Sequence, residues 1–550
     1  MKNRVLIFSI VALFLTGNMA CSDFLDTQPT DRISSEVAVR DVPSLRAILE
    51  QTYKNLINYN SDYAYAGLAG YQSFIDLRGQ DLIGYNNATW WNIWIIYEYR
   101  NTVTDAASDA INMWRYFYNI IRQTNIVLAN IDAAVGGEAA QNERNYIKGE
   151  SLALRAYSYF FMAQLYQQTY VGNENLKNVI LHTKPLIDPT GPDAQGARAS
   201  TKEIYDLVRA DLNTAIGLLP VASGTLGNRV SYRINKNIAQ AMLAKVSLVT
   251  NEWSVAESMA RAARGGYALM EAEDYLKGFG LNPLTNDDKN PEWIWYLPQT
   301  TRTSTSTGAR HPSTWANMNW SGVRTPTDMI YVSFDLMDLY ESEDVRFAQF
   351  WPRTDRENIR TGGYLWTSNK FADFYAGNFV YAGTQKINPN YTGTHPDADA
   401  IYRAYSGHVA DRTYNGQINL FRAADMWLIE AEALARQGKD AEATALLNEL
   451  RIKRNASEVA VTGSDLVEEI LKERRRELYG EGSYLFDMLR TKKGLKRGPD
   501  HPGQLDRPAG DYIFLFQIPS TEFIYNAALS ITNDQNPFEG TTIPSNMVKN

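Results

Sequence analysis

Two clusters of tryptophan carry side chains suited to binding a sugar. The first cluster is Trp90, Trp91 and Trp94, and the second contains Trp315 and Trp320. A flat aromatic ring packs against the apolar C–H face of a pyranose, while amides, carboxylates and guanidinium groups bond to its hydroxyls. The two clusters therefore predict a platform that binds a ligand rather than a centre that transforms one.

Polar neighbours distinguish the second cluster from an ordinary core. Core packing is the alternative for any single tryptophan, since this residue is highly buried on average. Around the second cluster, however, the neighbours are serine and asparagine, which do not make a core. The predicted ligand-binding residues are Arg78, Trp91, Trp94, Asn101, Tyr296, Trp315, Asn317, Asn319 and Trp320.

Catalytic and metal-binding signatures are absent from the sequence. It contains no GxSxG, P-loop or HExxH motif, and its five histidines are never three to five residues apart. Asp287-Asp288 and the pair Asp397 and Asp399 lack the spacing of an EF-hand, so we interpret them as solvated loop acids. We expect no enzyme activity and no cofactor; a structural calcium ion and a glycosidase-like pair of carboxylates stay open as alternatives.

Composition narrows the class of protein further. The chain has 550 residues, of which 44% are hydrophobic and 21% charged, values typical of a globular protein. Lys and Arg number 54 against 62 Asp and Glu, a net charge of −8, which argues against a general nucleic-acid binder. A single cysteine excludes an internal disulfide framework and a thiolate metal cluster.

The amino terminus is typical of an export signal. Lys2 and Arg4 precede an apolar run from Val5 to Leu15, which is too short to span a bilayer. The only cysteine, Cys21, follows this signal at the place where a bacterial lipoprotein would be cleaved and acylated. We predict a signal peptide over residues 1–20 and attachment to a membrane through lipid on Cys21; ordinary secretion is the alternative.

Pairs of amphipathic helices must position the tryptophan clusters. Apolar residues recur at helical spacing, and the predicted helices cover about residues 152–166, 204–219, 239–246, 256–263, 427–435 and 443–450. Ser200 and Glu203 form a candidate capping box, and Gly438 has the position of a left-handed helix end. The predicted fold is mainly α, a TPR-like helical-repeat scaffold of about four helix pairs with a loop-rich insertion that carries short strands.

The chain divides by composition into four parts. After the signal, residues 21–270 form a helical part, residues 271–420 a loop-rich part that we expect to bind the ligand, and residues 421–550 a part with the last helix pair. Within the last part, the basic run from Lys472 to Arg476 alternates with glutamates. This spacing favours a solvated helix face over a site for an anion.

The order of these features resembles the SusD/RagB family of surface glycan-binding lipoproteins, which belong to nutrient-uptake systems of Bacteroidetes. The motifs that carry the resemblance are Cys21 to Asp26, Trp114 to Tyr116 with Asn125, Gly149 to Tyr157, Asp211-Leu212, Asp344 to Arg346, Glu430 to Leu434, Leu447 to Arg451, Arg474 to Leu478, Gly480 to Gly482, Phe486 to Arg490, Phe516 to Pro519, and Asn533 to Pro537. Each motif is weak alone, but together they extend over nearly the whole chain.

The resemblance implies a function and a location. It implies that the protein is anchored in the outer membrane, exposed at the cell surface, and passes an uncleaved oligosaccharide or polysaccharide to a SusC-like TonB-dependent transporter. It also implies a ligand site built from a segment near residue 100 and a loop at the start of the variable part, as the two tryptophan clusters would supply. A peptide or other nutrient as ligand, a surface glycosidase, and a TPR adaptor without a small ligand are the alternatives.

Overall fold

Helix follows helix along most of the chain. The computed structural model describes residues 39–57, 67–84, 96–99, 108–186, 195–222, 232–275, 290–298, 330–357, 364–368, 370, 417–502 and 505–537. The α-helices are α3 (Val42–Ile57), α4 (Leu68–Leu77), α6 (Ser108–Asn130), α7 (Gln141–Ala163), α8 (Thr201–Leu218), α9 (Lys236–Val249), α10 (Trp253–Ala263), α11 (Ala272–Tyr275), α13 (Phe334–Met337), α15 (Ala423–Arg436), α16 (Asp440–Lys453), α17 (Gly463–Leu478), α18 (Tyr484–Arg490), α19 (Ser520–Tyr525) and α20 (Ile531–Asp534). Short 3-10 helices are η2 (Glu138–Ala140), η5 (Val345–Gln349) and η8 (Tyr512–Phe514).

Local signals explain where two of the helices begin and end. At the start of α8, the Ser200 hydroxyl accepts from the backbone N–H of Glu203, whose carboxylate accepts from the N–H of Ser200, so the predicted capping box is confirmed. At the end of α15, Gly438 has φ +74°. Its N–H donates to Ala435, and the next N–H donates to Leu434, which is the Schellman arrangement.

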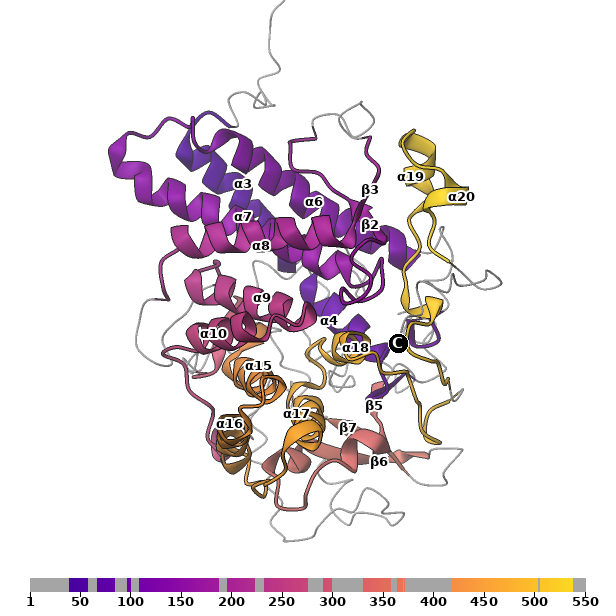
Figure 1. The fold of residues 1–550 in the computed structure, drawn as a ribbon. Helices are drawn as coiled ribbons and strands as arrows, with labels where there is room; N and C mark the ends of the chain where they lie inside the picture. The colour runs from indigo at the N-terminus through magenta and orange to yellow at the C-terminus, as the bar shows by residue number, and fades with distance from the viewer. Residues whose placement is uncertain are drawn as a thin grey trace, which may run out of the picture.

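The helices stack in chain order. α7 packs on both α6 and α8, α8 packs on α9, α9 on α10, and α10 on α15, against which α16 and α17 also pack. Figure 1 shows this stack running from α3, α6, α7 and α8 at one end of the molecule to α15, α16 and α17 at the other. The predicted mainly α scaffold of stacked helix pairs is confirmed.

Short antiparallel strands supply the remaining regular structure. The strands are β1 (Leu82–Gly84), β2 (Lys177–Ile180), β3 (Arg198–Ser200), β4 (Trp293–Pro298), β5 (Ile330–Val332), β6 (Phe350–Glu357), β7 (Tyr364–Ser368) and β8 (Gln417–Arg422). One sheet has the order β1-β5-β7-β6, and β2–β3 and β4–β8 form separate pairs. The strands β4 to β7 lie within the predicted loop-rich part, so its expected short strands are confirmed.

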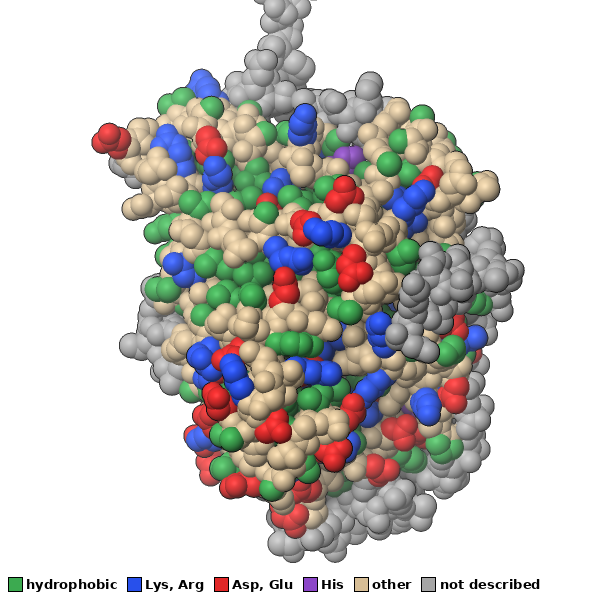
Figure 2. Space-filling model, viewed as in Figure 1, with side chains coloured by type: hydrophobic (Ala, Val, Ile, Leu, Met, Phe, Trp, Pro, Cys, Tyr) green, Lys and Arg blue, Asp and Glu red, His purple; other side chains and the backbone are tan. Residues whose placement is uncertain are grey.

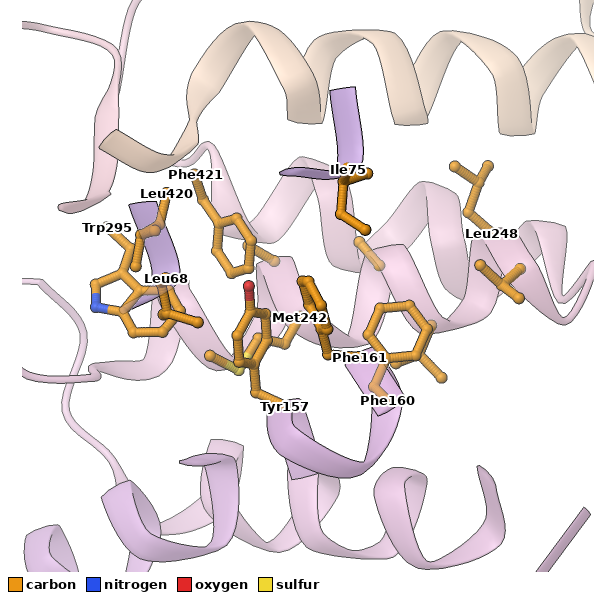
Figure 3. Close-up of a cluster of buried hydrophobic side chains, with 14 of the residues drawn as sticks. Leu68, Ile75, Tyr157, Phe160, Phe161, Met242, Leu248, Trp295, Leu420 and Phe421 are labelled. Atoms are coloured by element: carbon orange, nitrogen blue, oxygen red, sulfur yellow. The ribbon is translucent and has the colours of Figure 1, made fainter. Parts of the chain in front are cut away.

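Aromatic packing joins the loop-rich part to the helical scaffold. Tyr157 on α7 lies 5.5 Å from the ring centre of Trp295 on β4 and 5.9 Å from that of Phe421 on β8. Figure 3 shows these rings beside Phe160 and Phe161, with aliphatic side chains from other elements around them. All five residues belong to one buried cluster that extends from Val42 to Leu529, so the predicted parts share a single core.

The surface carries both signs of charge. On the face drawn in Figure 2, acidic and basic side chains are intermixed. This face therefore lacks the single-sign field that attracts nucleic acid. Within the described ranges, no helix is long and apolar enough to cross a membrane.

Candidate ligand-binding site

Two short strands bring together the ends of the segments that carry the tryptophan clusters. Gly84, the last residue of β1, pairs with Ile330, the first residue of β5. Residues 85–95, which contain the first cluster, follow Gly84 directly, and residues 299–329, which contain the second, lead into Ile330. Paired residues of antiparallel strands have Cα atoms about 5 Å apart. One segment therefore starts where the other ends.

A buried tyrosine–histidine pair holds the chain just after the first cluster. Tyr97 is fully buried, and its hydroxyl lies 2.6 Å from Nδ1 of His501. The guanidinium carbon of Arg497 lies 3.7 Å from the centre of the Tyr97 ring, and its Nη1 donates to the Tyr97 carbonyl at 2.7 Å. Burial and the charge of Arg497 lower the pKa of His501 to about 3, so its imidazole is neutral near pH 7. These contacts anchor one end of residues 85–95.

Arg78 anchors the same region from the core. Its side chain is fully buried, and its guanidinium carbon lies 4.1 Å from the centre of the Tyr99 ring and 4.8 Å from that of Phe516. One Nη2 donates to the carbonyls of Ile513 and Phe514. Burial lowers the pKa of Arg78 to about 10. In this structure the side chain offers no surface to a ligand, and its contacts stabilise the fold.

Asp76, near the end of α4, makes the stability of this region depend on pH. Burial raises its pKa to about 7, although its carboxylate accepts from the N–H of Gly482 at 2.8 Å. A folded pKa above the unfolded one gives stability at low pH that is lost as the pH rises toward 7. The variant Asp76→Asn cannot ionise at this position. We therefore expect its free energy of unfolding, relative to that of the wild type, to be about 2–3 kcal/mol higher at pH 8 than at pH 5. Urea unfolding at both pH values measures this change, and an equal difference at the two values would contradict it.

Tyr296 also lies in the core. It belongs to β4, is 3% exposed, and its ring centre is 5.5 Å from that of Trp293. β4 pairs with β8, where Tyr296 lies opposite Asn419. Tyr296 therefore supports the strand that leads into residues 299–329 and presents almost no surface to a ligand.

The other predicted site residues lie outside the part of the chain that the structure describes. They are Cys21, Trp91, Trp94, Asn101, Trp315, Asn317, Asn319 and Trp320. The aspartates considered for calcium, Asp287, Asp288, Asp397 and Asp399, also lie outside it. Their roles stay predictions. Among the described residues, no group of three or more histidine, cysteine, aspartate or glutamate side chains could hold a metal ion.

The basic run on α17 is largely buried, and the prediction of a solvated helix face is wrong. Glu473, Arg474 and Glu477 are at most 3% exposed, whereas half of the Lys472 side chain is exposed. The buried charges face oppositely charged residues from distant parts of the chain. Spacing along a single helix does not reveal such partners.

These partners form a buried network, which we call the arginine–glutamate cluster. It comprises Glu292, Asp344, Arg346, Lys370, Arg422, Arg451, Arg454, Glu473, Glu477 and Glu481. Arg476 also pairs with Glu473, so each carboxylate of the network faces at least one basic group, as burial of ions requires. Members from residues 271–420 pair with Arg422 of β8, with Arg454 just after α16, and with Glu473, Glu477 and Glu481 on or just after α17. The cluster therefore fastens the loop-rich part to the last helix pair.

The carboxylate of Glu481, a member of this cluster, accepts hydrogen bonds from residues on both sides of residues 371–416. Lys370, just before that segment, donates to Glu481 at 2.7 Å. Asn419 and Arg422, just after it, donate to the same carboxylate at 3.1 and 2.8 Å. The two ends of the segment are thus held at a single point on the helical scaffold.

A separate buried ion pair gives a structural role to three of the sequence motifs that carry the family resemblance. Arg155 on α7 donates to both oxygens of Asp211 on α8 at 2.8 Å, and to Oδ1 of Asn125 on α6 at 2.8 Å. Arg155 and Asp211 are less than a tenth exposed, and Asn125 is 1% exposed. These residues join three successive helices, so their role is structural.

The anchors Tyr97, Arg497 and His501 were missed by reasoning from the sequence. The available signal was weak, since His501 is one of five histidines and stands alone in a loop. Its partner Tyr97 lies about 400 positions away in the chain. Only the fold brings them together.

The fold and its buried ion pairs define the class of protein. It is a stack of TPR-like helix pairs to which buried ion pairs attach a loop-rich part. The chain belongs to the SusD/RagB family. Residues 23–248 match a SusD-like family model described as "Starch-binding associating with outer membrane", and residues 286–513 match the model of the SusD family.

Individual proteins support the same assignment. A SusD-like protein of Formosa agariphila is 26% identical over 421 residues, which cover 72% of this chain and 75% of that protein. The starch-binding protein SusD of Bacteroides thetaiotaomicron is 35% identical over 160 residues, 28% of this chain and 27% of that protein.

Solved structures share the fold. A SusD-like carbohydrate-binding protein from Bacteroides vulgatus has a TM-score of 0.71 at 22% identity, covering 92% of this chain and all of that chain. A laminarin-binding SusD-like protein has a TM-score of 0.63 at 21% identity, covering 90% of this chain and 99% of that chain.

Proposed function

We propose that this protein is a cell-surface lipoprotein that binds an oligosaccharide or polysaccharide and passes it, uncleaved, to a SusC-like TonB-dependent transporter of the outer membrane. Lipid on Cys21 would hold it to that membrane. The two tryptophan clusters would form the ligand platform.

The pairing of Gly84 with Ile330 carries this proposal. It makes residues 85–95 and 299–329 neighbours at one end of each, although more than 200 positions separate them in the chain. Side chains from both segments can then contribute to one surface. The buried anchors beside them, Tyr97 and Arg78, give that surface a rigid base.

The relatives support the nature of the ligand. Three of the relatives named above are described as binding starch, carbohydrate or laminarin. Aromatic platforms suit neutral sugars of many linkages, because the C–H face of a pyranose is similar in each. A binding role without cleavage agrees with the absence of catalytic motifs in the sequence.

Replacing Trp315 or Trp320 by alanine is expected to weaken glycan binding by about 10- to 100-fold, because a stacking ring is lost from the platform. A screen of polysaccharides first identifies a ligand, and calorimetry then gives Kd for each variant. Trp253→Ala, a change to a partly buried tryptophan on α10, is the matched control and should keep wild-type affinity.

Further measurements separate the alternatives. Peptides tested in the same screen should not bind; tight binding of peptides alone would favour another nutrient. Incubation with a bound polysaccharide should release no new reducing ends, and steady release would establish a glycosidase. Unchanged affinity in both tryptophan variants would place the ligand elsewhere on the protein.

A further inference from the structure

A pocket with both polar and apolar walls lies between α17 and α18, and none of the residues proposed for the platform lines it. Its volume is about 420 Å³, which suits a small-molecule ligand. Gln80, Tyr484 and Thr491 contribute polar groups, while Leu471 and Met488 contribute apolar surface. α17 and α18 pack on each other, and Figure 1 shows them side by side. Residues of these two helices line part of the pocket, and the remaining lining residues lie in loops beside them.

The aromatic residue of the pocket is held in place. The guanidinium carbon of Arg475 lies 5.1 Å from the centre of the Tyr484 ring, and Arg475 is itself paired with Asp81 at 2.5 Å. Gly79 packs so closely on the ring that an added Cβ would lie 2.6 Å from Cδ1 of Tyr484. Since Tyr484 is only partly buried, the pocket includes part of a fixed aromatic ring.

The charges that line the pocket are mainly positive. Four basic residues line it, namely Lys472, Arg475, Lys493 and Lys496, against the two acids Glu468 and Asp487. Asp487 accepts from Arg474 and Arg490, each at 2.7 Å, and Arg475 pairs with Asp81, so the charges that a ligand would meet are those of the three lysines and Glu468.

The lysines at the rim can turn toward a ligand. Lys472 pairs with Glu469 and Lys493 with Glu468, but about half of each lysine side chain is exposed. Exposed ion pairs are worth less than about 1 kcal/mol. An incoming anion can therefore compete for both ammonium groups.

The pocket lies beside the start of β1, the strand from which residues 85–95 continue. Gln80 lines it two residues before β1, and residues 85–95 leave the other end of β1. A three-residue strand spans about 10 Å, the length of two sugar rings. A bound chain of a few sugars could thus extend from the pocket along the length of β1 to Gly84.

We propose that the pocket between α17 and α18 binds an acidic sugar unit. Its carboxylate or sulfate group bonds to the rim lysines, and its ring lies against Tyr484. The inference rests on the proposed function, because it names the class of glycan that this protein recognises.

Calorimetry with three probes tests this site: trigalacturonate, a sulfated galactan trisaccharide and neutral laminaritriose. The pocket variant is Lys472→Gln with Lys493→Gln, the two half-exposed lysines of the rim. The control is Lys148→Gln with Lys202→Gln, which removes two charges from α7 and α8. We expect the pocket variant to weaken binding of at least one acidic probe by about tenfold or more, and the control to change it by less than about twofold. The probe that responds distinguishes a carboxylate from a sulfate.

Other results overturn the inference. If neither acidic probe binds the wild type more tightly than laminaritriose, or if the pocket variant binds them as the control does, the pocket is not such a site. If polysaccharides bind and the Trp315 and Trp320 variants lose them while the pocket variant does not, the proposed function stands and only this inference fails. If the wild-type protein binds no glycan at all, both the proposed function and this inference fail.

Discussion

Replacing Glu477 by alanine is expected to lower the free energy of unfolding by about 3–5 kcal/mol. The Glu477 carboxylate accepts from Arg346 at 2.8 Å, from Arg422 at 2.6 Å and from Arg454 at 2.8 Å. None of these four side chains has exposed surface. Without the carboxylate, three guanidinium groups lose a shared partner where water cannot replace it.

Urea unfolding followed by circular dichroism measures this loss. Glu468→Ala on the same helix is the matched control, because Glu468 is half exposed and its pair with Lys493 should be worth less than about 1 kcal/mol. Glu477→Gln, which keeps the size of the side chain, serves if the alanine variant does not fold. A Glu477 variant as stable as the control would show that the arginines find other partners.

Acid is expected to destabilise the protein steeply between about pH 4.5 and pH 2. Burial alone would raise the pKa of Glu473, but Arg346, Arg476 and Arg451 outweigh it and lower this pKa to about 2. At Asp425, burial is likewise outweighed by Lys245 and Arg474, and the pKa falls to about 2.

A folded pKa below the unfolded value gives stability that is complete above the unfolded value and lost as the pH falls toward the folded one. Ordinary values are about 4 for both kinds of carboxyl, so each group contributes about 2–3 kcal/mol that disappears in this range. Urea midpoints at pH 6, 4 and 3 measure the loss. Glu473→Gln should already be less stable at pH 6 and lose less on acidification. Equal midpoints for the wild type at pH 6 and pH 3 would contradict the prediction.

Helices could be predicted from the sequence where their signals are local. The capping box at Ser200 and the left-handed glycine at Gly438 lie within a few residues of the groups they satisfy. The burial of Glu473 and Glu477 could not be predicted in this way. Their partners Arg346 and Arg422 are far away in the chain, and glutamates interleaved with basic residues look the same on a solvated helix.

The candidate site was predictable only in part. Arg78 was chosen for its charge, yet it follows the apolar end of α4 and is drawn into the core with Phe74 and Tyr99. That the two tryptophan clusters belong together came from resemblance to a family. The pairing of β1 with β5 gives a geometric reason to group the two clusters. It depends on two strands of three residues each. Patterns this short carry almost no signal.

The carboxylate of Glu481 has a consequence for how this protein can change in evolution. It binds Lys370 before residues 371–416 and Asn419 and Arg422 after them, so the residues that flank this segment on both sides are held at one carboxylate. The entropy of closing a loop grows slowly, and doubling its length costs only about 0.6 kcal/mol. Changes of length between these anchors therefore add little to the free-energy cost of closing the segment. Selection for a new nutrient can therefore act on this insert with little cost to folding.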